Sequence, residues 1–159
     1  AEPTDTFNVA SQIANYLNGQ EYDMVLLGNE TINYNGSVLG GMLAELLDLP
    51  YVSLGVKLDI EGNTATIERD IEGGREVVEV ATPFVASAQK GMAEARIPNM
   101  RGIMAARTKP VAVEAASEAA THTSVKSYQL PPAKSDVRLI SPDNVGELAD
   151  LLHNEAKVI

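Results

Sequence analysis

The 159-residue chain contains no cysteine, no tryptophan and only two histidines. Without cysteine, disulfide bonds and thiolate metal sites are excluded. No stretch approaches the 18 apolar residues of a membrane-spanning helix, so we expect no membrane insertion. His122 and His153 are far apart, and neither a Gly-Lys-Ser/Thr phosphate loop nor a Gly-x-Ser-x-Gly motif occurs. We therefore expect no catalytic residues and no metal site, and we expect both histidines to lie on the surface.

Acidic residues outnumber basic residues by 22 to 12, which gives a net charge of −10. The excess is uneven, because residues 84–110 hold five basic side chains and one acidic side chain. An acidic body disfavours nucleic acid as a partner. The basic segment could face an acidic protein surface or a cofactor phosphate. The alternative is a solvated basic face, which has no partner.

Residues 22–50 have the pattern of a strand, a loop and a helix. An apolar run at 24–27 ends at Gly28, a polar loop follows, and residues 37–41 (SVLGG) are expected to start a helix. The N–H groups of a first helical turn have no partner within the helix, and the helix dipole favours an anion there. The pattern is typical of a phosphate site, although a purely structural turn remains an alternative.

The rest of the chain alternates between helical and strand patterns. Apolar residues at helical spacing predict a helix after Thr4 and Asp5 that ends near Gly19, and another helix before Pro50. A hairpin turn is expected at 72–75, because Gly73 and Gly74 tolerate positive φ. A terminal helix is expected at 142–156. Strands are expected at 22–28, 51–58, 64–71, 76–81, 83–88, 110–113 and 137–140. Together these patterns predict an α/β fold.

One longer pattern carries a resemblance to a known family. Residues 67–78 read IERDIEGGREVV and, after four residues, PFVAS follows at 83–87. This pattern closely resembles the signature of the electron transfer flavoprotein beta subunit. Residues 22–50 resemble the adenine-nucleotide loop of that family, residues 96–105 its partner-recognition loop, and residues 137–159 its C-terminal segment. The resemblance covers nearly the whole chain.

The resemblance implies a heterodimeric electron carrier rather than an enzyme. FAD would be shared with an alpha subunit, which holds most of the flavin, and the beta subunit would hold AMP or a second FAD. Electrons would pass from an acyl-CoA or other dehydrogenase to a quinone-reducing or other acceptor. The implied location is cytoplasmic in a bacterium and the mitochondrial matrix in a eukaryote. A stand-alone adenine-nucleotide-binding domain of the universal-stress-protein type is the alternative.

The resemblance also assigns two groups of residues. The chain departs from the family in the nucleotide group, where residues 33–35 (NYN) replace acidic residues and residues 37–39 (SVL) replace a more polar triplet. Backbone donors survive such changes. The nucleotide-binding residues implied are Gly28, Asn29, Asn33, Asn35, Gly36, Ser37, Val38, Leu39 and Gly40. The partner-docking residues implied are Arg96, Met100, Arg101, Ile103 and Met104.

In the docking group, Met100 stands where the family places an apolar anchor. Its apolar surface would supply affinity, and the flanking Arg96 and Arg101 would steer encounter with an acidic partner. Internal packing of Met100 or Met104 is the alternative.

The expected fold is a three-layer, Rossmann-like sheet with helices on both faces, similar to the adenine-nucleotide alpha-hydrolases, plus a C-terminal arm. Residues 1–113 would form the nucleotide-binding domain, and residues 114–135, rich in Ala, Ser, Thr and Pro, a linker or arm. Residues 136–159 would form a strand-helix segment that contacts the alpha subunit. Because an initiator methionine and the family's N-terminal portion are absent, we expect a fragment with an incomplete first domain.

Overall fold

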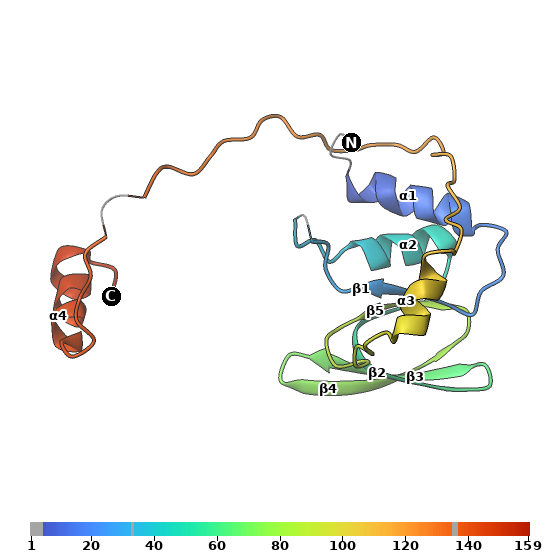
Figure 1. Ribbon diagram of the computed structural model, residues 1–159, viewed down its shortest axis with the longest axis horizontal. Helices are drawn as coiled ribbons and strands as arrows, with labels where there is room; N and C mark the ends of the chain where they lie inside the picture. Colours follow the sequence, from blue (N-terminus) through green and yellow to red (C-terminus); the bar gives the residue numbers. More distant parts are fainter. Residues whose placement is uncertain (1–4, 33, 135–136) are drawn as a thin grey trace. The chain divides into compact units, whose positions relative to one another are not determined.

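A computed structural model of the protein describes residues 5–32, 34–134 and 137–159. The chain divides into two compact units, which meet between Val125 and Lys126. The first unit contains a five-stranded sheet (Figure 1). Its elements are α1 (Thr6–Leu17), β1 (Met24–Gly28), α2 (Leu39–Leu47), β2 (Tyr51–Glu61), β3 (Thr64–Ile71), β4 (Gly74–Ala81), β5 (Phe84–Ala88) and α3 (Met100–Ala106).

The sheet is open and mixed, with the strand order β1-β5-β2-β3-β4. β5 pairs in parallel with β1 and β2, whereas β2, β3 and β4 form an antiparallel meander. The order places the last strand in the chain between two earlier ones, which explains why residues 84–87 of β5 are all buried. Strands buried on both faces are typical of the parallel part of a sheet. The α/β class and the open sheet are therefore as expected from the sequence.

The core lies on the two faces of β5 and β2. One face holds a cluster of buried side chains from the three central strands, and the other face is covered by α2. Leu43 and Ala44 are the buried apolar residues of α2, which packs against both this face and α1. α1 packs alongside α2 (Figure 1). The cluster consists of Val52, Ala65, Ile67, Phe84 and Ala86.

The predicted hairpin between β3 and β4 is confirmed. Its loop is the two residues Glu72 and Gly73, and Gly73 has a φ of +88°. Only glycine adopts such a backbone conformation without steric cost. Ile71 pairs directly with Gly74, so the loop is as tight as a hairpin allows.

Two of the predicted strands do not form. Residues 110–113 and 137–140 have no regular secondary structure and pair with no strand in the part of the chain that the structure describes. Both segments are rich in apolar residues, but an apolar composition does not by itself make a strand. In the second unit, the predicted helix is present as α4 (Val145–Asp150), which continues directly into a π-helical turn, η1 (Leu151–Glu155).

Candidate functional site

The loop between β1 and α2 is closed by its own hydrogen bonds. The N–H of Thr31 donates to the carbonyl of Gly36, at 3.0 Å, and the N–H of Gly36 donates to Oγ1 of Thr31, at 3.1 Å. The N–H of Asn35 donates to the carbonyl of Thr31, and Asn35 has a φ of +51°. These bonds fix the loop in front of α2. They also occupy the N–H of Gly36, which is then not a free phosphate donor.

α2 begins at Leu39, two residues later than the sequence pattern suggested. The first backbone bond across a turn of this helix runs from the N–H of Met42 to the carbonyl of Val38. The N–H groups of Leu39, Gly40 and Gly41 therefore have no partner within the helix. No side chain caps this end of α2, because Val38 is the N-cap residue. An anion would be stabilised at this position by the donors and by the helix dipole.

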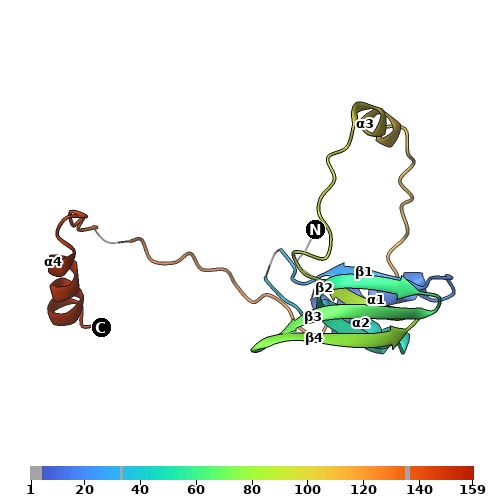
Figure 2. The ribbon, with the colours of Figure 1, turned by 90° about the horizontal axis from the view of Figure 1, so that it is seen from below.

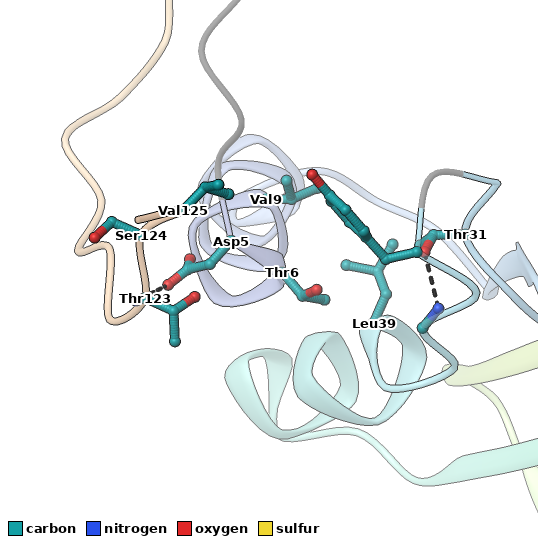
Figure 3. A pocket seen from close by; sticks show the side chains of 10 residues that line it. Asp5, Thr6, Val9, Thr31, Leu39, Thr123, Ser124 and Val125 are labelled. Carbon is teal, nitrogen blue, oxygen red and sulfur yellow. Dashed lines mark hydrogen bonds between the residues drawn. The ribbon is translucent and has the colours of Figure 1, made fainter. Parts of the chain in front are cut away.

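A pocket with a volume of about 260 Å³ lies between the start of α1, the loop before α2 and residues 123–125. Figure 3 shows Thr31 and Leu39 on one side of the start of α1, and Thr123, Ser124 and Val125 on the other. Most of the side chains that line the pocket either carry a hydroxyl group or are apolar. The lining consists of Asp5, Thr6, Val9, Thr31, Tyr34, Gly36, Leu39, Thr123, Ser124 and Val125.

Asp5 is the charged residue of this lining, and hydrogen bonds compensate its charge. Oδ1 accepts from the N–H of Asn8 at 2.8 Å, which caps α1. Oδ2 accepts from the N–H groups of His122 and Thr123. The Asn8 hydrogen bond, followed by the bonds from Thr123 and His122, lowers the pKa of Asp5, although partial desolvation opposes them.

Residues 123–125, which form one wall of the pocket, are the end of a longer segment that is hydrogen-bonded to α1. We call residues 117–125 the strap. The side-chain amide of Gln12 makes a two-way contact with Ser117, donating to its carbonyl at 2.6 Å and accepting from its N–H at 2.8 Å. One turn earlier on α1, Nδ2 of Asn8 donates to the carbonyl of Ala119 at 2.9 Å. The ring of His122 lies 4.6 Å from that of Phe7, measured between centroids.

The structure brings only part of the implied nucleotide group to this pocket. Gly36 and Leu39 line it, while Gly28, Asn29, Asn35, Ser37, Val38 and Gly40 do not. Asn33 lies outside the described residues. Gly40 has a packing role, because a Cβ there would come within 2.7 Å of the Tyr51 ring. Ser37 and Val38 are exposed in front of α2.

The sequence patterns did not identify most of the residues that line the pocket. Asp5 was identified only as a residue that precedes the first helix, and Thr31 lies in the loop without belonging to a motif. Thr123, Ser124 and Val125 lie more than 80 residues beyond the loop in the sequence, and no local pattern connects them to it. Hydrogen bonds of the strap with α1 and Asp5, together with the contact between the rings of His122 and Phe7, bring them to the pocket.

The implied docking residues lie on and beside α3, away from the core. Figure 2 shows the chain leaving the sheet after β5, forming α3 and returning. The side-chain oxygen of Asn99 caps this helix by accepting from the N–H of Gly102 at 2.8 Å. No residue of α3 is buried. Met100 is 71% exposed and Met104 55% exposed, so neither packs internally as the alternative required.

The apolar surface of this segment is larger than the sequence suggested. Ile97, which was not among the implied docking residues, is 96% exposed, and Ile103 is 38% exposed. Arg96 and Arg101 are exposed as well. We call residues 96–104 the docking segment. Apolar side chains flanked by cations are the composition expected of a contact surface for an acidic protein.

Two further features of the described residues concern metal binding and membrane insertion. No group of His, Asp or Glu in these residues could hold a metal ion. None of the described helices is long and apolar enough to cross a membrane.

The sheet and its helices define an α/β protein with a Rossmann-like open sheet. Comparison with known proteins is more specific, because residues 1–119 match the electron transfer flavoprotein domain family. The chain belongs to this family. The universal-stress-protein alternative finds no support in the matches.

Curated relatives agree with the family match. The electron transfer flavoprotein subunit beta of Bacillus subtilis is 34% identical over 98% of this chain, and that of Syntrophomonas wolfei is 35% identical over 97%. The subunit beta of the mouse is 30% identical over 85%. The chain spans 64%, 62% and 54% of the lengths of these three relatives.

Proposed function

We propose that the chain acts in the beta subunit of an electron transfer flavoprotein. This subunit pairs with an alpha subunit and accepts electrons from an acyl-CoA or other dehydrogenase. The observation that carries the proposal is the family match over residues 1–119, with relatives of that name aligned along nearly the whole chain. FAD shared with the alpha subunit would supply the redox chemistry. The chain itself needs no catalytic residues for such a role, because electron transfer depends on the proximity of cofactors.

The pocket would serve as the adenine-nucleotide site of the subunit. Its volume of about 260 Å³ is near the lower end of ligand pockets, which start at roughly 300 Å³. That size favours a mononucleotide over a second FAD. The phosphate would meet the N–H groups at the start of α2, and the nucleoside would meet the hydroxyl and apolar lining. The charge of Asp5 does not oppose a phosphate strongly, because both carboxylate oxygens already accept hydrogen bonds.

The docking segment would carry the contact with the dehydrogenase. Its apolar residues are exposed and its cations are free to steer encounter with an acidic surface. The location would follow the source, cytoplasmic in a bacterium and the mitochondrial matrix in a eukaryote.

Calorimetry on the heterodimer with the alpha subunit tests the nucleotide site. We expect one AMP to bind per heterodimer in addition to one FAD, and adenosine to bind at least tenfold more weakly, because it lacks the phosphate. Thr31→Val, which removes the hydroxyl that fixes Gly36, should weaken AMP binding. If AMP, ADP and FAD all fail to bind on the beta side, the assignment of the site is wrong.

A further inference from the structure

The strap is held on α1 by polar contacts that recur with the spacing of the helix. Asn8, Gln12 and Asn15 lie on one face of α1 because they are three or four residues apart. Gln12 and Asn15 both contact Ser117, and Asn8 contacts Ala119, two residues further along the strap. The amide of Gln12 pairs with both backbone groups of Ser117, as a neighbouring strand would.

Apolar burial contributes little to this attachment. Ala119 is half-buried, and the other residues of the strap are exposed. The contacts of Gln12 with Ser117 are themselves exposed to solvent. A segment that is held mainly by solvent-exposed hydrogen bonds opens more readily than a buried strand. We therefore expect that the strap can separate from α1 while the sheet stays folded.

Opening of the strap would change the pocket, because the strap forms part of its lining. The end of the strap, residues 123–125, is one wall of the pocket, and the opposite wall is the loop before α2 (Figure 3). The backbone of Thr123 is fixed to Asp5 at 2.8 Å, at the edge of the same pocket. Release of the strap would remove this wall and leave the loop and the start of α2 in place.

We propose that the strap is a gate over the nucleotide pocket and that Asn8 and Gln12 are positioning residues that hold it closed. The proposal rests on the proposed function, because the ligand is taken to be an adenine mononucleotide. By linkage, a ligand that prefers the closed pocket must also stabilise the closed strap. AMP should then slow amide hydrogen exchange in residues 117–125.

The test compares three variants of the heterodimer with the wild type. Asn8→Ala together with Gln12→Ala removes the α1 side of the attachment, and alanine preserves the helix. Ser117→Pro removes the N–H that donates to Gln12 without changing α1. Ser11→Ala is the matched control, because Ser11 lies beside Gln12 but donates to the carbonyl of Phe7 within the helix. Asp5 is left intact because it also lines the pocket.

Hydrogen exchange and AMP binding kinetics are measured on each protein. We expect both attachment variants to exchange at least tenfold faster in residues 117–125 and to release AMP at least tenfold faster, with unchanged exchange in β5. The Ser11→Ala control should match the wild type in both measurements. A purely structural strap would change exchange without changing the AMP dissociation rate, and that result would overturn the gate.

Two further outcomes separate the proposals. In the first outcome, the wild type binds AMP, and both attachment variants match it in the hydrogen exchange of residues 117–125 and in the rate of AMP release. The strap is then not a gate, but the nucleotide site is still supported. If the wild type binds no adenine nucleotide, the nucleotide site is wrong and the gate over it falls with it.

Discussion

The sheet and the segment that follows it use different means of holding a chain in place. In β5 the side chains of residues 84–87 are buried, and the backbone pairs with strands on both sides. Between residues 89 and 134 nearly every residue is exposed, and the chain is attached mainly where the strap meets α1. The sheet provides a rigid support through apolar burial, whereas the later segment keeps its apolar and charged groups available for contact.

The largest expected effect comes from the centre of the sheet. Phe84→Ala removes a fully buried ring, and such a change typically lowers the free energy of unfolding by about 3–5 kcal/mol. Urea denaturation of the protein should show this loss. A decrease below 1 kcal/mol, beyond the expected range for a buried ring, would mean that the core is not packed around β5.

A smaller effect is expected where α2 crosses β2. Gly40→Ala places a methyl group within 2.7 Å of the Tyr51 ring, and overpacking of this kind costs about 1–3 kcal/mol. The penalty should largely disappear when Tyr51→Ala is already present, because the clashing ring is gone. A double-mutant cycle measures this coupling. Full additivity of the two changes would show that Gly40 is not required for helix packing.

The attachment of the strap to the start of α1 is expected to depend on pH, because Asp5 takes part in it. Because hydrogen bonds lower the pKa of Asp5 below its ordinary value near 3.8, its stabilising contribution is present above that value. The contribution is lost as the pH falls through the lowered pKa. His122 is the titratable neighbour in this contact, and its own charging lowers the pKa of Asp5 further.

The protection factors of residues 117–125 against hydrogen exchange should therefore fall below pH 4 before those of β5 do. The variant Asp5→Asn should abolish this difference between acidic and neutral pH, because its side chain does not titrate. Protection factors that fall in both regions at the same pH would indicate global unfolding rather than release of the strap.

The smallest effect on stability is expected in the docking segment. Ile97→Ala and Met100→Ala remove exposed side chains, so the free energy of unfolding should change by less than about 0.5 kcal/mol. Electron delivery from the dehydrogenase at sub-saturating concentration should nevertheless slow, because truncation of an interface anchor typically costs 1 kcal/mol or more in binding. Stopped-flow reduction measures this rate. Val113→Ala, exposed but outside the docking segment, is the control.

The elements with strong local patterns could be predicted from the sequence. The meander of β2, β3 and β4 was predictable because the apolar alternation and the glycine turn at Gly73 act over short distances. The unpaired segments at 110–113 and 137–140 were predicted as strands because their composition is apolar. Strand formation, however, also requires a partner edge, and composition does not report whether one is present.

The candidate site was predictable only in part, for the same reason. Local pattern identified the start of α2 and the exposed cations of the docking segment, although it set the helix start two residues early. The local pattern did not indicate that Gly40 lies against the Tyr51 ring. The same spacing of glycines is compatible with close approach of a ligand or of an aromatic ring. The local pattern also omitted Ile97, whose exposure depends on the absence of a covering element.

The sequence by itself determined the family, the α/β class and the short-range elements of this protein, because these depend on residues that are neighbours along the chain. The tertiary structure decided that β5 lies between β1 and β2, that Gly40 serves packing, and that residues 123–125 form a wall of the pocket. The strap reaches α1 through hydrogen bonds between residues more than 100 positions apart. Such contacts arise only when the folded backbone brings donor and acceptor together, so no local pattern specifies them.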